Sequence, residues 1–196
     1  MTTLDAILQT RFHGAVNIRG IRYQVLYSLG RAFELYDHAG GGSVLRLEGI
    51  EDVDLLGFHQ NATYVQVKSA QSPWNWAKLK EPIAVFFEVL RTAPNSQFLL
   101  AVSFPLTGDI ERLARFAQLD RGEQNRIQGA FQRLCRSVKG TAAEADALLS
   151  RLQIKSQREE EIWQTLRREI SDHFELGSPA VETYLLVLVA RFLEWA

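Results

Sequence analysis

An apolar run at residues 98–104, Phe-Leu-Leu-Ala-Val-Ser-Phe, constrains the fold of this chain more than any other segment. A strand that is apolar on both faces has to be covered on both sides, and a sheet flanked by helices provides that cover. We therefore expect residues 98–104 to form a buried central strand in a layered arrangement of helices and strands.

The patterns on either side of this run agree with a layered α/β fold. Apolar residues at helical spacing predict a helix over residues 19–38, and short alternating segments predict three strands at 44–48, 52–56 and 64–68. A further helix is expected over residues 77–92. After Gly108 the expected helices cover residues 109–118, 122–138, 142–150, 159–174 and 179–196, with a short extended piece at 152–156.

The element order predicts an α/β fold with a mixed central sheet flanked by helices and a helical C-terminal extension. We expect a core in residues 1–107 and the extension in residues 108–196. The sequence ends within an expected helix. We therefore expect the chain to be the front part of a longer protein.

Charge and cysteine content exclude several classes of function. Twenty-two Lys and Arg side chains against 23 Asp and Glu give a net charge of −1, so a nucleic-acid partner has to be argued from a local site. Cys135 is the only cysteine, which excludes an internal disulfide and a cysteine-based zinc cluster within one chain. The apolar run at residues 184–190 is too short to span a bilayer. We expect a reducing, cytoplasmic location and no membrane partner.

Carboxylates are concentrated in the segment from residue 48 to residue 54, between and within the first two expected strands. Glu48, Asp52 and Asp54 lie in or beside the first two strands, and Gln66 and Lys68 lie two residues apart on the third. Residues two apart on a strand share one face. The sequence therefore predicts a polar face on an otherwise apolar strand.

The turn between these strands decides which side chains meet. A turn centred on Gln60 places Asp54 opposite Gln66 and Asp52 opposite Lys68. A turn centred between Gln60 and Asn61 places Asp54 on the other face, because a slip of one residue reverses every side chain. The prediction therefore requires an odd-length loop or a compensating bulge.

A carboxylate, an amide oxygen and a lysine in this arrangement suit phosphodiester chemistry. Mg²⁺ prefers oxygen ligands and keeps several waters. A bound cation acidifies water and screens a phosphodiester, and a neighbouring lysine stabilises developing negative charge. The plain alternative is a solvated strand face with a cross-strand ion pair.

At these residues the sequence resembles a known family. Asp54, followed by Gln66-Val67-Lys68, resembles the core of the PD-(D/E)xK, restriction-endonuclease-like nucleases. The wider pattern resembles the double-stranded-DNA nuclease domain of bacterial antiphage effectors of the CBASS and AVAST type. The likeness covers residues 19–104 and is carried by Arg19-Gly20, Tyr23-Gln24, the segment 48–54 and the segment 64–69.

This resemblance implies roles for individual residues. Asp54 would be the chief metal ligand, Gln66 the second ligand and Lys68 the catalytic lysine, with Asp52 and Glu48 as further metal ligands. We favour Asp54 over Asp52 because the apolar residues after it are typical of a strand interior. The family pattern has Asp or Glu where this chain has Gln66, and a neutral amide binds a cation more weakly than a carboxylate.

The resemblance also implies that Gln24, on the first helix, reaches the site as an accessory residue. Its other implications are Mg²⁺ as cofactor with Mn²⁺ as substitute, double-stranded DNA as substrate, a homo-oligomer, a C-terminal sensor domain or partner protein, and the bacterial cytoplasm. The alternative from another class is a catalytically inactive module that binds nucleic acid or mediates oligomerisation. A third interpretation is a scaffold whose last two helices form the interface.

Two further features leave alternatives open. Trp74 and Trp76 follow the lysine strand, where indoles either stack on bases or pack in a loop, and burial would exclude stacking. Basic residues outnumber acidic ones between residues 112 and 139, which indicates either phosphate contacts or a solvated helical surface.

Overall fold

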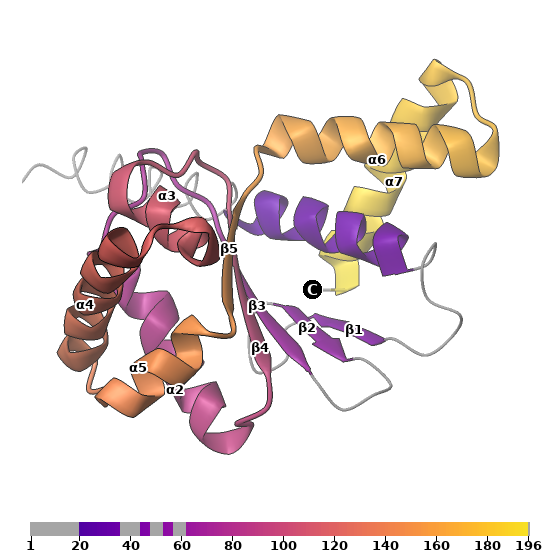
Figure 1. Ribbon diagram of the computed structural model, residues 1–196. Helices are drawn as coiled ribbons and strands as arrows, with labels where there is room; N and C mark the ends of the chain where they lie inside the picture. Colours follow the sequence, from indigo (N-terminus) through magenta and orange to yellow (C-terminus); the bar gives the residue numbers. More distant parts are fainter. Residues whose placement is uncertain (1–19, 36–43, 48–52, 57–61, 196) are drawn as a thin grey trace, which may run out of the picture.

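The computed structural model describes residues 20–35, 44–47, 53–56 and 62–195, and for residues 44–47, 53–56 and 192–195 it describes the backbone alone. An N-terminal helix covers residues 20–35 (Figure 1). The strands are β1 (Val44–Leu47), β2 (Val53–Leu56), β3 (Thr63–Lys68), β4 (Gln97–Val102) and β5 (Leu152–Ser156). The helices are α2 (Lys80–Thr92), α3 (Gly108–Ala114), α4 (Arg121–Ser137), α5 (Ala142–Leu149), α6 (Glu159–Phe174) and α7 (Ser178–Trp195), with a short 3₁₀ turn, η1 (Phe116–Gln118).

The strands form one mixed sheet in the order β1-β2-β3-β4-β5 (Figure 1). The pairs β1–β2 and β2–β3 are antiparallel, whereas the pairs β3–β4 and β4–β5 are parallel. Parallel neighbours need crossover connections, and here α2 links β3 to β4 while α3, α4 and α5 link β4 to β5. The expected α/β class with a mixed sheet flanked by helices is confirmed.

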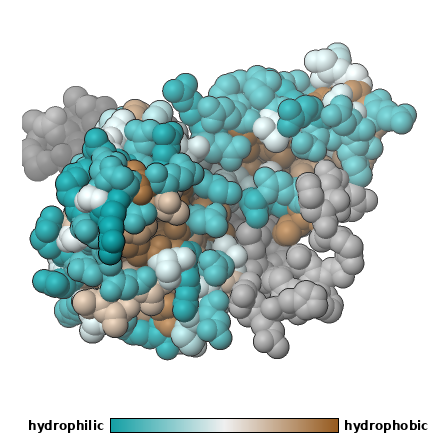
Figure 2. Space-filling model, in the orientation of Figure 1, coloured by the Kyte–Doolittle hydropathy of each residue, from teal (hydrophilic) through white to brown (hydrophobic). Residues whose placement is uncertain are grey.

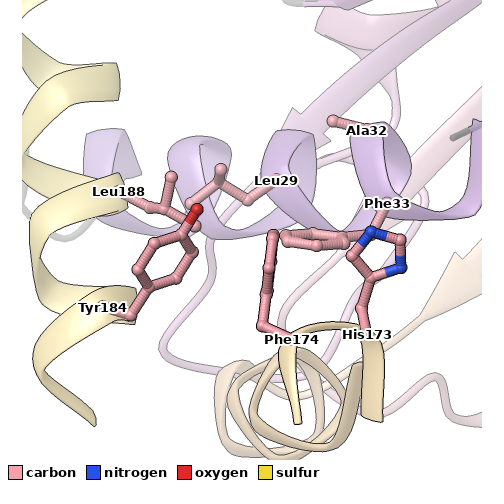
Figure 3. A pocket seen from close by; sticks show the side chains of 7 residues that line it. All are labelled: Leu29, Ala32, Phe33, His173, Phe174, Tyr184 and Leu188. Atoms are coloured by element: carbon pink, nitrogen blue, oxygen red, sulfur yellow. The ribbon is translucent and has the colours of Figure 1, made fainter. Parts of the chain in front are cut away.

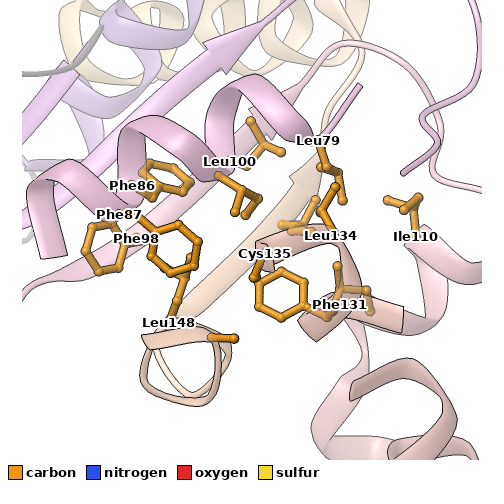
Figure 4. Close-up of a cluster of buried hydrophobic side chains, with 14 of the residues drawn as sticks. Leu79, Phe86, Phe87, Phe98, Leu100, Ile110, Phe131, Leu134, Cys135 and Leu148 are labelled. Carbon is orange, nitrogen blue, oxygen red and sulfur yellow. The ribbon is translucent and has the colours of Figure 1, made fainter. Parts of the chain in front are cut away.

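One face of the sheet packs against α2, α4 and α5. Phe98 and Leu100 of β4 meet Phe86 of α2, Phe131 of α4 and Leu148 of α5 in a continuous apolar cluster (Figure 4). The apolar stripe of α4 explains its orientation, because its buried residues recur at helical spacing.

The other face of the sheet packs against the N-terminal helix and α6, with α7 behind them (Figure 1). Val65 and Val67 of β3 and Leu99 of β4 meet Leu26 of the N-terminal helix and Leu166 of α6 in this second cluster. The alternation of the two clusters along β4 shows that it is buried on both faces, as its sequence predicts.

Residues 108–196, which we expected as an extension, take part in the central sheet. They contribute β5, which pairs with β4, and they supply buried residues to both apolar clusters. The expected boundary between core and extension at residue 107 stays a prediction, but the side-chain packing is continuous across it.

Element boundaries follow the expected ones closely, with one split helix. The expected helix over residues 109–118 ends at Ala114, and the chain tightens into η1 before it turns. α4 then begins after Asp120, whose carboxylate accepts a hydrogen bond from the Glu123 backbone. This N-cap fixes where α4 begins. None of the described helices has the length and apolar character needed to cross a bilayer.

Candidate functional site

The candidate site lies on β3, whose two faces differ in chemistry. Val65 and Val67 are almost fully buried in the cluster formed with the N-terminal helix. Tyr64, Gln66 and Lys68 occupy the other face, on the side of α2. Tyr64 and Gln66 are both buried, at 7% and 3% exposed, whereas the Lys68 side chain at the end of the row is 29% exposed. The row therefore leads from the apolar core to the surface.

Tyr64 closes the inner end of this row. Its ring lies 6.4 Å from the Phe98 ring of the neighbouring strand, within the cluster beneath α2. Gln66 follows it and pairs in register with Leu100 of β4. A buried amide in this position is unusual, since buried polar side chains have to be compensated by hydrogen bonds or a ligand.

Lys68 ends the strand and reaches the first turn of α2. Its Nζ lies 3.3 Å from Oε1 of Glu81, whose side chain is 77% exposed. An ion pair of this exposure contributes little stability, so it positions Lys68 without burying its charge. Glu81 is not among the residues that the sequence singled out. The signal for it is topological: the helix after a strand begins beside that strand's carboxyl end.

The backbone around Lys68 is fixed by the neighbouring strand. The Lys68 carbonyl accepts a hydrogen bond from the Ser103 backbone at 3.2 Å, and the Ser103 hydroxyl accepts one from the Ala70 backbone at 2.9 Å. These bonds tie the ends of β3 and β4 together. Lys68 thus stands on a rigid element.

The register of β2 on β3 differs from the expected one by two residues. Asp54 pairs with Tyr64, not with Gln66, and Val53 pairs with Val65. A shift of two residues preserves the face, because side chains alternate with a period of two. The positions of Asp54, Gln66 and Lys68 therefore belong to one face of the sheet, as the sequence predicts, with Asp54 diagonal to Gln66.

Several sequence candidates lie elsewhere or outside the described residues. Glu48, Asp52 and the turn at Gln60 belong to the part of the chain that the structure does not describe. Gln24 belongs to the N-terminal helix, which packs on the face of Val65 and Val67. The structure thus places the helix of Gln24 on the opposite side of the sheet from the row of Gln66 and Lys68.

The two tryptophans after the lysine strand differ in burial, which decides whether they could stack on bases. Trp74 is 5% exposed and packs in the cluster beneath α2, which excludes it as a stacking platform. Trp76 is half-buried and packs against the same cluster. Both indoles therefore stabilise the loop before α2.

Metal-binding groups are sparse in what the structure describes. Among side chains with described positions, which leave out Glu48, Asp52 and Asp54, no group of three or more His, Cys, Asp and Glu gathers. The described donors near the candidate site are the Gln66 amide oxygen and the Glu81 carboxylate. Oxygen donors of this kind fit Mg²⁺ better than a softer metal.

A pocket of about 330 Å³ lies in the opposite layer, between the N-terminal helix, α6 and α7 (Figure 3). Its lining is almost entirely apolar: Leu29, Ala32, Phe33, Phe174, Tyr184 and Leu188, with His173 at one side. It is separated from Gln66 and Lys68 by the sheet. This pocket is therefore not part of the candidate site.

The comparisons with known proteins show a fold likeness. No protein-family model matches the chain, and no curated protein matches it. Solved structures of the Cap4 SAVED/CARF-domain containing receptors from Moraxella osloensis and Acinetobacter baumannii superpose with a TM-score of 0.59 at 15% and 16% identity. One of the Acinetobacter baumannii structures contains the cyclic trinucleotide 2'3'3'-cAAA.

The match covers 88% of this chain but only 40% to 42% of the receptor chains. The chain thus spans about two-fifths of the length of these receptors. At this identity the match shows a shared fold.

Proposed function

We propose that this chain is a metal-dependent endonuclease domain that hydrolyses double-stranded DNA, within a bacterial antiphage effector. The observation that supports this proposal best is the polar row of β3, in which a buried amide, Gln66, stands between Tyr64 and Lys68. The register position of Asp54 lies on the same face. The fold likeness to Cap4 receptors supports the antiphage setting.

Residues of β3 and of the preceding carboxylate segment would have different roles in the reaction. The Asp54 carboxylate and the Gln66 amide oxygen would hold Mg²⁺, with Asp52 and Glu48 as further ligands. Bound in this way, Mg²⁺ would neutralise charge on a phosphodiester and make water a better nucleophile. The Lys68 ammonium group would stabilise the charge that develops on the phosphate. Its Nζ is positioned by Oε1 of Glu81, 3.3 Å away.

Substitution of Lys68 tests the proposal directly. We expect Lys68→Ala to abolish Mg²⁺-dependent degradation of a plasmid, while circular dichroism shows an intact fold. The matched control is Lys155→Ala. Lys155 is an exposed strand lysine whose register partner, Ala101, belongs to the opposite face of the sheet. It should retain full, EDTA-sensitive cleavage.

Two outcomes would reject the nuclease. Undiminished cleavage by Lys68→Ala would remove the assigned role of the row. A wild-type chain that cleaves with neither Mg²⁺ nor Mn²⁺ would instead support the alternative, an inactive module that binds nucleic acid or mediates oligomerisation.

A second candidate function is reception of a cyclic oligonucleotide. The observation that favours it is the fold likeness to a receptor solved with a cyclic trinucleotide. The apolar lining of the pocket between α6, α7 and the N-terminal helix opposes it, because phosphates require polar or cationic partners. Calorimetric titration with 2'3'3'-cAAA separates the two: the nuclease proposal expects no binding by this chain.

A further inference from the structure

The outward face of α4 carries a narrow stripe of arginines and glycines. Its members recur at helical spacing on the side opposite the buried residues Ile127, Phe131 and Leu134. We call it the α4 arginine stripe, and it consists of Gly122, Arg126, Gly129, Arg133 and Arg136. The stripe contains no acidic residue and no large apolar residue.

Carboxylates lie along both edges of the stripe and are already engaged. On one edge Asp109 accepts hydrogen bonds from both terminal nitrogens of Arg126 at 3.0 Å, and Glu123 pairs with Arg112 at 3.3 Å. On the other edge Asp146 accepts hydrogen bonds at 2.9 Å from the amides of Gln128 and Gln132.

The remaining arginines of the stripe keep their charge available. Within the described residues, the guanidinium groups of Arg133 and Arg136 have neither an ion pair nor a hydrogen bond to a carboxylate. Both side chains belong to exposed residues. Gly129 leaves room beside one of them, since a Cβ at residue 129 would lie 3.8 Å from Nη1 of Arg133.

The chemistry of the stripe fits a phosphate backbone. Guanidinium groups bind phosphates through two parallel hydrogen bonds, and the glycines allow a bulky backbone to approach the helix closely. Without large apolar side chains, the stripe offers neither an anchor for a protein interface nor a face that enters a bilayer. Figure 2 shows hydrophilic residues along the outer edge of the molecule where α4 lies in Figure 1.

The dimensions of the stripe fit a duplex. Arg126 and Arg136 are ten residues apart, which corresponds to about 15 Å along a helix. The major groove of B-DNA is about 12 Å wide. The stretch from Arg126 to Arg136 is thus about as long as one groove is wide, and its carboxyl-terminal part, with Arg133 and Arg136, carries the available charge.

We propose that the α4 arginine stripe binds the sugar–phosphate backbone of duplex DNA. The choice of duplex DNA rests on the proposed function. α4 packs against α2 on the face of the sheet that carries Tyr64, Gln66 and Lys68. A duplex held by the stripe therefore lies on the same side of the sheet as the candidate site.

The test measures binding without cleavage. Fluorescence anisotropy of a labelled 30-base-pair duplex, with EDTA present, gives the Kd of the 196-residue chain at several salt concentrations. We expect the double variant Arg133→Gln/Arg136→Gln to raise the Kd by about tenfold or more. The slope of log K against log salt should become shallower by about 1.8, because each phosphate contact contributes about 0.9.

The matched control is Arg168→Gln, which removes an exposed arginine from α6 in the opposite layer. Its Kd and salt slope should equal those of the wild type. The charge reversal Arg133→Glu should weaken binding more than Arg133→Gln. Circular dichroism checks that every variant is folded.

Three results would contradict the proposal that the stripe binds duplex DNA. These are a wild-type chain that does not bind the duplex, a double variant that binds it as the wild type does, or polyglutamate of matched charge that competes as well as unlabelled duplex. Cleavage is scored separately with Mg²⁺. A chain that binds through the stripe but never cleaves refutes the nuclease and supports the stripe. A chain that cleaves but binds independently of Arg133 and Arg136 refutes the stripe alone.

Discussion

The two faces of β3 differ in the polarity of their buried side chains. On the face toward the N-terminal helix, Val65 and Val67 are 0% and 1% exposed and pack in an apolar cluster. On the face toward α2, the strand carries Tyr64, Gln66 and Lys68, and only the first of these joins the apolar cluster. Two neighbouring positions, 66 and 67, are thus both buried, at 3% and 1% exposed, but carry side chains of opposite polarity.

This difference separates packing from function. Burial of a valine removes apolar surface from water and stabilises the fold. Burial of an amide gives no such gain and requires polar compensation. A fold under selection for stability alone would favour an apolar residue at position 66. The amide at position 66 is therefore the feature of the α2 face on which the proposed site rests.

The largest effect is expected when the same carboxylate is placed on each face in turn. Val67→Glu puts an unpaired charge into the apolar cluster with the N-terminal helix, and we expect it to lower the free energy of unfolding by about 4 kcal/mol or more. Gln66→Glu restores the residue type of the family motif beside Lys68. We expect a smaller loss, which Mn²⁺ reverses by raising the melting temperature.

Thermal melts with EDTA or Mn²⁺ measure both variants. Wild type and Val67→Glu should respond less to Mn²⁺ than Gln66→Glu does, because a carboxylate binds a cation more strongly than an amide. Equal losses on the two faces, with no recovery by Mn²⁺, would contradict the distinction between them.

A smaller effect is expected from two glycines in the layer that covers the α2 face. At Gly140 an added Cβ would lie 2.4 Å from Cε2 of Phe87, in the cluster of Figure 4, and 3.1 Å from the Cys135 carbonyl. We expect Gly140→Ala to destabilise the protein by about 1–3 kcal/mol through overpacking. At Gly129, within α4, the nearest atom would be 3.8 Å away.

Gly129→Ala is therefore the matched control, and it should stabilise the protein by about 0.4–1 kcal/mol because alanine restricts the unfolded chain. Urea denaturation measures both changes. A Gly140→Ala variant as stable as Gly129→Ala would show that this layer packs more loosely than the close contact with Phe87 requires.

The sequence predicts the fold well where periodicity is strong. The apolar run that forms β4, the valine alternation of β3 and the amphipathic pattern of α4 depend on burial alone, so their patterns survive in the folded chain. The boundary between α3 and η1 was less predictable, because it depends on a change to i→i+3 hydrogen bonding around Arg115 that no pattern in the sequence marks.

The sequence predicts the candidate site only in part. The common face of Asp54, Gln66 and Lys68 follows from strand periodicity, whereas the pairing of Asp54 with Tyr64 depends on the length of the turn. Glu81 escaped notice because its contact with Lys68 arises from the placement of a helix, which no local pattern encodes. The α4 arginine stripe shows as a local charge excess, but only the structure separates engaged from available arginines.

The smallest expected effect concerns the link between α2 and α5, both in the layer on the α2 face. Glu144 receives hydrogen bonds from Nε of Arg91 and from the Thr141 backbone, each at 2.7 Å. Chiefly the bond from Arg91, and then those from Thr141, lower the pKa of Glu144 to about 2. Its ordinary value is 4.5.

A carboxyl group with a lowered pKa stabilises the folded state above its unfolded pKa, and this contribution is lost as the pH falls toward the folded value. The wild type should therefore lose stability between about pH 4.5 and pH 2, and Glu144→Gln should be less stable at pH 7 but flatter across this window. Because the Arg91 side chain is 48% exposed, we expect a difference of about 1 kcal/mol at most. Urea denaturation at several pH values measures it. Arg91→Gln should likewise reduce the pH dependence of stability between pH 4.5 and pH 2, since it removes the principal cause of the lowered pKa of Glu144. A steep acid transition retained in both variants would show that the acid-sensitive contact lies elsewhere.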